Sequence, residues 1–308
     1  MIYDSLCELV GNTPMLRARN FEKSENIEAE LLCKLEYFNP AGSVKDRVAK
    51  EIIEEAERKG TLRKGGTIIE STSGNTGIGL AAIATAKGYK CIIVMPDTMS
   101  MERRYLMKAY GAELVLTDGA LGMKGANEKA AELAKTIDGA FLASQFTNRA
   151  NPMAHEKTTG PEIWENTEGR VDIFVACIGT GGTISGTGSY LKSKNHDIQI
   201  VGVEPYSSPL LTKGVSGAHK IQGIGANFVP DTLDKTVYDE IITVTDEDAY
   251  EYARRFVKCE GALVGISSGA ALSCAVTLAK REENKGKRIV VLLPDSGERY
   301  LSTPGFIE

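Results

Sequence analysis

The sequence lacks any long hydrophobic run. Its longest apolar runs, such as residues 91–95 and 289–293, have the length of one β-strand, whereas a membrane-spanning helix needs about 20 apolar residues. The first residues, Met-Ile-Tyr-Asp-Ser, also lack the basic and apolar regions of a secretory signal peptide. We therefore expect a cytoplasmic protein with no membrane partner.

Metal-binding and disulfide patterns are missing as well. The six cysteines include no Cys-x-x-Cys pair, and the three histidines are far apart and form no His-Glu-x-x-His motif. Zinc sites have other spacings, so we expect no metal site. We interpret the cysteines as small buried hydrophobic residues in a reducing compartment. They are Cys7, Cys33, Cys91, Cys177, Cys259 and Cys274.

Charge of one sign is not concentrated in this chain. Its formal net charge is −5 and it has no dense cluster of Lys and Arg, so we expect no nucleic-acid partner. The sequence is 42% hydrophobic and 25% charged, as is ordinary for a globular protein. Its 308 residues suffice for one large domain or two ordinary ones with a substantial core.

Strand-like and helix-like segments alternate along most of the chain. This alternation predicts mostly parallel sheets covered by helices. The predicted strands lie near residues 67–70, 91–95, 113–116, 171–178, 198–204 and 289–293. The predicted helices lie near residues 75–87, 100–109, 247–258 and 268–280. A further helix is predicted after the strand at 113–116 and runs through residue 130. A polar cluster at 145–149, followed by Pro152, indicates a domain boundary near residues 147–151.

Glycine is concentrated in one loop. Residues 179–188 read Gly-Thr-Gly-Gly-Thr-Ile-Ser-Gly-Thr-Gly and follow the apolar run at 171–178. Such a loop presents backbone N–H groups at a helix N-terminus, where phosphate binds well. It is not Gly-x-Gly-x-x-Gly, because Ile184 replaces the third glycine, and the chain has no Gly-x-x-x-x-Gly-Lys-Ser/Thr. The loop predicts a phosphorylated ligand, and the alternative is a tight turn for close packing of a helix on a sheet.

A lysine follows a turn at the start of another predicted helix. Residues 39–43, Asn-Pro-Ala-Gly-Ser, have turn chemistry, and Val44, Val48 and Ile52 then recur at helical spacing. Lys45 therefore lies in the first helical turn, beside the apolar stripe. A lysine is usually a solvated surface charge. A desolvated lysine, however, loses its charge more readily and becomes an amine that reacts with carbonyl groups.

Several segments in order resemble the fold type II pyridoxal-phosphate enzymes, the tryptophan-synthase-β-like superfamily. Residues 39–47 resemble the segment with the cofactor-bearing lysine, and residues 179–183 resemble the phosphate loop. Within the superfamily, the chain is most similar to the cysteine synthase (O-acetylserine sulfhydrylase) family. The further matching segments are Leu-Val-Gly-Asn-Thr-Pro at 9–14, Thr-Ser-Gly-Asn-Thr-Gly at 72–77, Thr-Thr-Gly-Pro-Glu-Ile-Trp at 158–164, His-Lys-Ile-Gln-Gly-Ile-Gly-Ala at 219–226, Gly-Ile-Ser-Ser-Gly at 265–269 and Asp-Ser-Gly-Glu-Arg-Tyr at 295–300.

The resemblance implies a fold and a cofactor. It implies an α/β fold of two domains, each with a mostly parallel twisted sheet flanked by helices, and pyridoxal 5'-phosphate (PLP) in the cleft between them. Residues 40–147 would form a smaller, mobile substrate-binding domain. Residues 1–39 and 148–308 would form the larger domain, which binds the cofactor phosphate.

The resemblance also implies roles for individual residues. Lys45 would bind the cofactor covalently and act as general base, and Asn75 would hydrogen-bond the ring hydroxyl group. Ser267 would face the pyridine nitrogen; unlike a carboxylate, a serine does not keep that nitrogen protonated, which suits β-elimination. The expected phosphate-binding residues are Gly179, Thr180, Gly181, Gly182 and Thr183.

A second loop is expected to bind the substrate. Residues 72–76 lie between a predicted strand and a predicted helix, so hydroxyl and N–H groups converge where an α-carboxylate would be stabilised; simple N-capping is the alternative. In the family this loop closes on the amino acid. Gln145 resembles the second carboxylate contact, and a loop cap is the alternative. The expected substrate-binding residues are Thr72, Ser73, Gly74, Thr76 and Gln145.

The resemblance implies PLP-dependent β-replacement, in which O-acetyl-L-serine and sulfide give L-cysteine and acetate for cysteine biosynthesis. It further implies a homodimer and capture of the C-terminal peptide of serine acetyltransferase. A rival hypothesis is a cystathionine β-synthase-type condensation of serine or O-acetylserine with homocysteine. Two more hypotheses are a non-catalytic scaffold for serine acetyltransferase, against which an intact Lys45 argues, and a nucleotide-binding oxidoreductase, against which the missing fingerprint argues.

Overall fold

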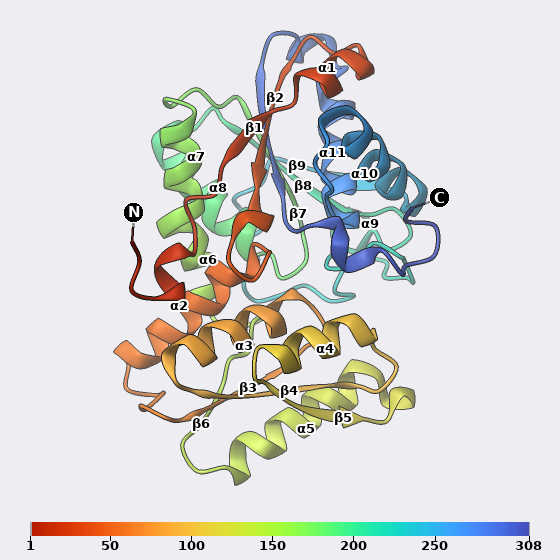
Figure 1. The fold of residues 1–308 in the computed structure, drawn as a ribbon. Helices are drawn as coiled ribbons and strands as arrows, with labels where there is room; N and C mark the ends of the chain where they lie inside the picture. The colour runs from red at the N-terminus through yellow and green to blue at the C-terminus, as the bar shows by residue number, and fades with distance from the viewer. Residues whose placement is uncertain (1, 308) are drawn as a thin grey trace.

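Two β-sheets organise the protein (Figure 1). The structure is a computed structural model that describes residues 2–307. The first sheet, called the large sheet here, has six strands in the order β1-β2-β10-β7-β8-β9. Its strand β1 pairs antiparallel with β2, and its other pairs are parallel. The strand bounds are β1 Met15–Arg17, β2 Glu30–Leu35, β7 Ile173–Cys177, β8 Gln199–Pro205, β9 Glu240–Val244 and β10 Arg288–Leu293.

The second sheet, called the small sheet here, has four strands in the order β5-β4-β3-β6, and all of its pairs are parallel. All four of its strands lie between residues 67 and 142. The bounds are β3 Thr67–Ser71, β4 Lys90–Pro96, β5 Glu113–Thr117 and β6 Ala140–Leu142. The two sheets confirm the α/β class that the alternating pattern predicted.

Each sheet buries both of its faces, which explains why its central strands are apolar without a polar alternate position. Along β7, Ile173 and Val175 belong to one hydrophobic cluster, whereas Phe174 and Ala176 belong to another. In β4, Ile93 likewise packs in a different cluster from Ile92 and Val94. Because side chains alternate between the faces of a strand, both faces of these strands contribute to a core.

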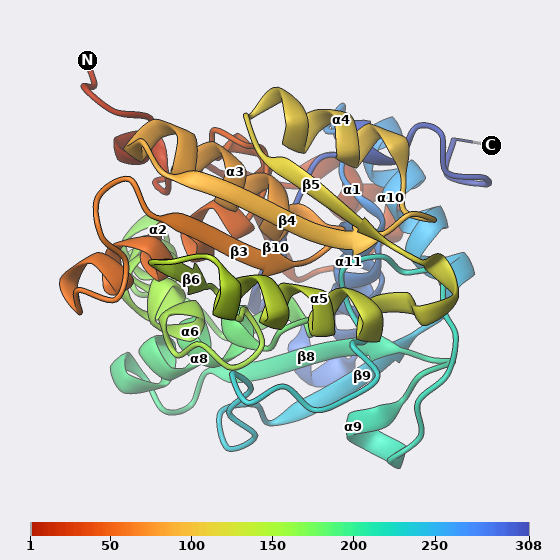
Figure 2. The ribbon, with the colours of Figure 1, turned by 90° about the horizontal axis from the view of Figure 1, so that it is seen from below.

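Helices cover these faces (Figures 1 and 2). In Figure 1, α2, α3 and α4 lie on the side of the small sheet that faces the large sheet, and α5 lies on the opposite side. Around the large sheet, α6, α7 and α8 lie on one side and α1, α10 and α11 on the other. The bounds are α1 Arg19–Glu25, α2 Lys45–Arg58, α3 Asn75–Lys87, α4 Met101–Ala109, α5 Gly122–Thr136, α6 Ala150–Ala154, α7 Gly160–Asn166, α8 Gly182–Lys194, α9 Leu210–Lys213, α10 Asp246–Glu260 and α11 Ile266–Ala279.

Short 3-10 helices and one π-helical turn connect these elements. The π-helical turn η4 joins α6 directly to α7. Such turns inside helices often occur at functional sites. The bounds are η1 Leu6–Leu9, η2 Glu36–Phe38, η3 Gly119–Leu121, η4 His155–Thr159, η5 Glu282–Asn284 and η6 Gly297–Tyr300.

The carboxyl ends of the parallel strands place several predicted segments near one another. The chain leaves β3 at Ser71 and enters α3 at Asn75, and it leaves β7 at Cys177 and enters α8 at Gly182. Strand β10 ends at Leu293, shortly before Asp295. In open α/β sheets, ligands bind beyond such strand ends, and the candidate site lies there. The division into domains at residues 40 and 147 stays a prediction.

Candidate active site

One cavity brings most of the predicted site residues together. It has a volume of about 340 Å³, and we call it the site cavity. Twelve of the thirteen predicted site residues line it, and Gly182 is the exception. The twelve are Lys45, Thr72, Ser73, Gly74, Asn75, Thr76, Gln145, Gly179, Thr180, Gly181, Thr183 and Ser267. Segments that are more than two hundred residues apart in the chain therefore meet around one space.

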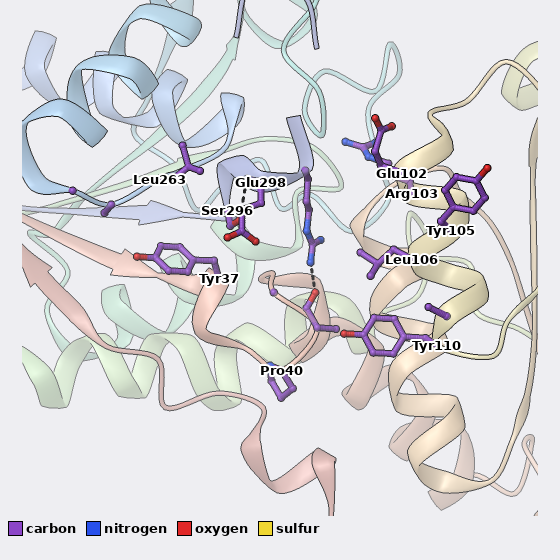
Figure 3. A pocket seen from close by; sticks show the side chains of 16 residues that line it. Tyr37, Pro40, Glu102, Arg103, Tyr105, Leu106, Tyr110, Leu263, Ser296 and Glu298 are labelled. Atoms are coloured by element: carbon purple, nitrogen blue, oxygen red, sulfur yellow. Dashed lines mark hydrogen bonds between the residues drawn. The ribbon is translucent and has the colours of Figure 1, made fainter. Parts of the chain in front are cut away.

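A second, larger cavity lies nearby and contains none of the predicted residues. Its volume is about 770 Å³. Figure 3 shows Leu106 of α4 and Tyr110, the residue after that helix, projecting into this region toward Pro40, with Tyr37 and Leu263 on the other side. We refer to it as the second cavity. Its size alone does not make it an active site, because its described lining includes neither Lys45 nor the glycine loop.

Lys45 is the first residue of α2, as predicted, and its side chain lines the site cavity. Burial lowers the pKa of its amine to about 8, and the negative charge of Asp295 opposes part of this shift. At neutral to mildly alkaline pH a substantial fraction of such an amine is uncharged. This lysine can therefore act both as a nucleophile toward a carbonyl carbon and as a base.

The glycine loop supplies a close backbone surface at the N-terminus of α8. A Cβ atom at Gly182 would lie 1.9 Å from Oδ1 of Asn151, and one at Gly179 would lie 2.3 Å from the carbonyl oxygen of Gly223. Gly181 has φ +83°, which disfavours other residues, and precedes the helix. The first N–H groups of a helix have no acceptor within the helix. This geometry matches an anion site and explains why the sequence needs glycine here.

A buried histidine supports the threonine of this loop. Nε2 of His155, in the π-helical turn η4, lies 3.2 Å from Oγ1 of Thr183, and its Nδ1 lies 2.9 Å from Oγ1 of Thr159. Burial lowers the pKa of His155 well below its usual value, and the charges of Lys45 and Arg47 lower it further. The imidazole is therefore neutral at pH 7 and orients the Thr183 hydroxyl without adding charge. Sequence reasoning missed His155, because it is far from the loop in the chain.

The loop between β3 and α3 lies on another side of the site cavity. Oγ1 of Thr72 accepts a hydrogen bond from the N–H of Gly74 at 3.2 Å, and Oγ1 of Thr76 donates to Oε1 of Gln145 at 2.6 Å. Gln145 follows β6, so this contact joins the two loops predicted to bind one carboxylate. Helix α3 has Gly74 at its N-cap and no side-chain capping hydrogen bond, so the structure does not support the N-capping alternative, and Thr72 instead lines the cavity.

A buried carboxylate fixes the backbone that carries Gln145. Oε2 of Glu70 accepts a hydrogen bond from the N–H of Ser144 at 2.7 Å, and Oε1 accepts from the N–H of Gln145 at 3.4 Å. Burial raises the pKa of Glu70 to about 7, although these backbone donors oppose the shift. Ser144 has φ +54°. Glu70 thus holds a strained turn that directs Gln145 into the site.

Asn75 is held by residues of the segment 295–300. This segment resembles the family, but the sequence analysis gave its residues no role. Its Nδ2 donates to Oδ2 of Asp295 at 2.7 Å, and its Oδ1 accepts from Nη1 of Arg299. Oδ2 of Asp295 also accepts from the hydroxyl group of Tyr300 at 2.6 Å. Oδ1 of Asp295 is buried and has no hydrogen-bond partner within the described residues, so this site has an unused acceptor beside the cavity.

Ser267 lies in the first turn of α11 and is buried. Its carbonyl oxygen accepts a hydrogen bond from Sγ of Cys177 at 3.1 Å, and both residues line the site cavity. Burial raises the pKa of Cys177 far above its usual value, so the thiol stays protonated. The thiol beside Ser267 therefore adds no charge to this part of the cavity.

Several further residues complete the lining. Phe146 and Phe228 contact each other edge to face, with ring centroids 5.0 Å apart, at one side of the cavity. Arg103, Met123, Asn127 and Gln222 line it as well. The sequence analysis assigned no role to any of them, although Gln222 falls within the matched segment 219–226. Segments such as α4 and α5 reach the site only through the folded topology.

The remaining sequence-based expectations concern metals, cysteines and membranes. Within residues 2–307, no group of three or more His, Cys, Asp or Glu side chains is arranged to hold a metal ion. The six cysteines are free thiols, and Cys177 and Cys259 are half-buried rather than fully buried. Over the same described range, no helix combines the length and apolar character needed to cross a membrane.

Comparison with known proteins identifies the family. Residues 6–295 match the family described as pyridoxal-phosphate dependent enzyme. Because the match covers almost the whole chain, the protein belongs to this family of pyridoxal-phosphate dependent enzymes. The predicted lysine and glycine loop both fall within the matched residues.

Within that family, several similar proteins are cysteine synthases. A cysteine synthase of Staphylococcus aureus (strain Mu50) is 54% identical over 302 residues, which cover 98% of this chain and 96% of the relative. The structure of a cysteine synthase from Entamoeba histolytica has a TM-score of 0.96 at 46% identity and covers 99% of this chain and 91% of that one. A hydrogen sulfide-producing enzyme from Fusobacterium nucleatum has a TM-score of 0.93 at 48% identity, covering 97% and 100%.

Proposed function

We propose that this protein is a cysteine synthase, which converts O-acetyl-L-serine and sulfide to L-cysteine and acetate by PLP-dependent β-replacement. The observation that carries this conclusion is the 54% identity to a cysteine synthase over nearly the full length of both chains. Enzymes of one family differ in substrate when the residues around the reacting atoms differ. The geometry of the site cavity therefore has to account for the reaction as well.

The residues of the site cavity fit PLP. A cofactor with an aldehyde group needs a nearby amine that is readily uncharged, and the pKa of Lys45 is lowered to about 8. Its phosphate needs backbone N–H groups, and Gly179, Gly181 and Thr183 line the cavity at the N-terminus of α8. The residues that would hold the phosphate are those of the glycine loop, Gly179 to Thr183. Asn75 and Ser267 would contact the ring.

The chain's own residues can then perform the reaction. When bound, PLP supplies an electron sink that stabilises negative charge at the substrate α-carbon. Thr72, Thr76 and Gln145 bind the α-carboxylate and thereby place the Cα–H bond near Nζ of Lys45. The Lys45 amine removes the α-proton as the Cβ–O bond to acetate breaks, and it returns a proton to Cα after sulfide has formed the Cβ–S bond.

The neutral hydroxyl of Ser267 favours this outcome. A carboxylate at its position would keep the pyridine nitrogen protonated and would strengthen the electron sink. With serine, negative charge at the substrate α-carbon is stabilised less strongly, so it does not persist before the leaving group departs. Elimination from Cβ is therefore favoured over competing reactions at Cα.

Condensation of serine or O-acetylserine with homocysteine is not favoured, because the relatives compared above include cysteine synthases at high identity over nearly the full chain. Initial rates with purified protein, PLP and O-acetylserine test the proposal directly when sulfide and homocysteine are compared at equal concentration. We expect cysteine and acetate in equal amounts and a much higher rate with sulfide. A higher rate with homocysteine would overturn the assignment in favour of the condensation.

Two further properties belong to this proposal. We place the enzyme in the cytoplasm, which is supported by six free thiols because reducing compartments preserve them. We also infer a homodimer. Phe38 stacks on Tyr37 and is nevertheless 56% exposed, so this aromatic ring is available to contact a second copy. Light scattering of the purified protein measures its mass, and a monomer at micromolar concentration would exclude the dimer.

A further inference from the structure

Arg103 connects the substrate loop to the opposite wall of the site cavity. It lies on α4, beside the small sheet, and its Nη1 donates a hydrogen bond to the carbonyl oxygen of Ser73 at 3.3 Å. Its Nη2 donates to Oε1 of Gln222 at 2.7 Å. Ser73 follows a strand of the small sheet, whereas Gln222 lies in the loop that leads to β9 of the large sheet. One guanidinium group thus links the two sides of the cavity.

The same side chain also borders both cavities. Arg103 lines both the site cavity and the second cavity, and Figure 3 shows it beside Glu102 on α4. Its guanidinium carbon lies 5.6 Å from the ring centroid of Tyr300, which lines the site cavity. These contacts depend on a planar cation that carries several N–H donors. Arginine has such a group, whereas lysine does not.

The contact with Ser73 acts on the backbone of the loop that leads into α3. The peptide unit between Ser73 and Gly74 is planar, so its C=O and N–H groups point in opposite directions. Its carbonyl accepts from Arg103, and its N–H donates to Oγ1 of Thr72. The two hydrogen bonds together fix the orientation of this peptide plane. The loop that leads into α3 therefore has one conformation when Arg103 is in place.

Neighbouring contacts strengthen this link. The hydroxyl of Ser302 donates to Oε1 of Glu102, the residue before Arg103. Asn75 on the other side of the loop contacts Asp295 and Arg299. Contacts between the small-sheet side and the large-sheet side therefore lie at both ends of the loop at residues 72–76. Among these contacts, the one made by Arg103 is to the loop backbone.

We propose that Arg103 is a positioning residue that holds the loop at residues 72–76 in its substrate-binding conformation by anchoring it to Gln222. This inference rests on the proposed function for the identity of the substrate. If only a fraction of molecules has the competent loop, the apparent affinity for substrate falls by that fraction. Loss of Arg103 therefore raises KM for O-acetylserine and leaves the chemical groups around Lys45 unchanged.

The test compares Arg103→Lys with Arg104→Lys, a matched control. Arg104 is the next residue of α4 and is half-buried like Arg103, but it donates a hydrogen bond to the carbonyl oxygen of Asp97, within the small-sheet side. We expect Arg103→Lys to raise KM for O-acetylserine about tenfold, with kcat within about twofold of the unsubstituted enzyme. Arg104→Lys should change neither constant by more than about twofold.

A double-mutant cycle tests the link between Arg103 and Gln222. Gln222→Ala should raise KM in the same way, and Arg103→Lys combined with Gln222→Ala should be no worse than the more severe single variant, because both remove one link. Additive effects would show that the two residues act independently and would overturn the proposal.

Amide hydrogen exchange supplies a measurement that needs no turnover. In the PLP-loaded protein, peptides that cover residues 72–80 should exchange at least about fivefold faster in Arg103→Lys than in the unsubstituted protein or in Arg104→Lys. If the unsubstituted protein makes no cysteine, the proposed function fails while this exchange result still decides the role of Arg103. Equal exchange in the two variants would refute that role, whatever the activity.

Discussion

Arg47 and Glu162 form a bidentate ion pair in the interior of the protein, two residues along α2 from Lys45. Nη1 and Nη2 of Arg47 donate to the two carboxylate oxygens of Glu162 at 2.6 and 2.7 Å. Lys34 contacts the same carboxylate at 2.7 Å, and Glu36 accepts from Nε of Arg47 at 2.7 Å. This buried cluster attaches α2 to α7 and to β2, and it thereby fixes the helix that begins at Lys45.

Removal of the charge of Glu162 should therefore destabilise the fold. Although burial alone would raise it, hydrogen bonds and charge from Arg47 lower the pKa of Glu162 to about 2. Glu162→Gln leaves Arg47 and Lys34 with too little negative charge, and we expect a loss of about 3 kcal/mol in the free energy of unfolding at pH 7. Urea unfolding measures it, with the exposed Glu165→Gln on the same helix as control.

The lowered pKa of Glu162 also fixes how stability depends on pH. A carboxyl group with a lowered pKa in the folded state stabilises the protein above its unfolded value of 4.5 and loses that contribution as the pH falls toward about 2. The unsubstituted protein should therefore lose stability more steeply than Glu162→Gln as the pH falls from 4.5 toward about 2. Parallel stability curves for the two proteins over this interval would contradict the role assigned to this ion pair.

Substitutions in the glycine loop should weaken cofactor binding. At Gly181, φ is +83° and a Cβ atom would lie 2.6 Å from Cβ of Leu233, so any side chain causes strain. Gly181→Asp also adds negative charge to an anion site, and we expect the PLP dissociation constant to rise more than about 100-fold. Thr183→Ala should raise it about tenfold through loss of one hydrogen bond.

Fluorescence titration with PLP measures both constants, and Gly181→Ala separates strain from charge. We expect Gly181→Ala to bind PLP more tightly than Gly181→Asp. Unchanged dissociation constants in Gly181→Asp and Thr183→Ala would show that the phosphate binds elsewhere.

A carboxylate at Ser267 should slow elimination. Ser267→Asp would keep the pyridine nitrogen protonated and strengthen the electron sink, which favours side reactions at Cα over departure of acetate. We expect the rate of acetate release to fall roughly 100-fold. Ser268→Ala is the control, because its buried hydroxyl group has no hydrogen-bond partner within the described residues. A stopped-flow rate for Ser267→Asp equal to that of the unsubstituted enzyme would place Ser267 away from the ring nitrogen.

The loop that binds the α-carboxylate should also accept the carboxyl end of a peptide. Thr72, Thr76 and Gln145 face the site cavity, and a peptide C-terminus presents the same group as the amino acid. We expect a peptide ending in isoleucine, such as the C-terminus of serine acetyltransferase, to compete with O-acetylserine. The amidated peptide should bind at least about tenfold more weakly, because the donors of the loop lose their anion. Equal inhibition by the two peptides would refute this mode of capture.

Much of the fold could be predicted from the sequence because its signals are local. The apolar runs and the helical periodicity predict α3 at 75–87 and strands that agree with β3, β4, β5, β8 and β10 within one or two residues. The glycine loop and the turn before Lys45 can likewise be predicted from the sequence, because loops that precede helices are rich in particular residues such as Gly, Asn, Pro and Ser. Strand β1 and the π-helical turn at His155 have no comparable local signal and were not predicted.

The residues of the site that were missed depend on contacts between distant segments. Asp295 belongs to a motif that the sequence matched, yet its role became visible only through its contact with Asn75 across 220 residues. His155 contacts Thr183, and Arg103 contacts Gln222. These contacts exist only because the order of strands in the two sheets brings distant segments together. Local periodicity specifies elements, whereas the lining of a cavity requires the full topology.

The most direct test of the central claim is reductive trapping of the cofactor. The protein is loaded with PLP, treated with borohydride, digested and analysed by mass spectrometry, with Lys50→Ala as a control on the same helix and Lys45→Ala as the variant. We expect a phosphopyridoxyl group on Lys45 in the unsubstituted protein and in Lys50→Ala, and both should make cysteine from O-acetylserine and sulfide. Lys45→Ala should carry no such group and should show no turnover. A modified lysine elsewhere, or near-normal turnover by Lys45→Ala, would contradict the account.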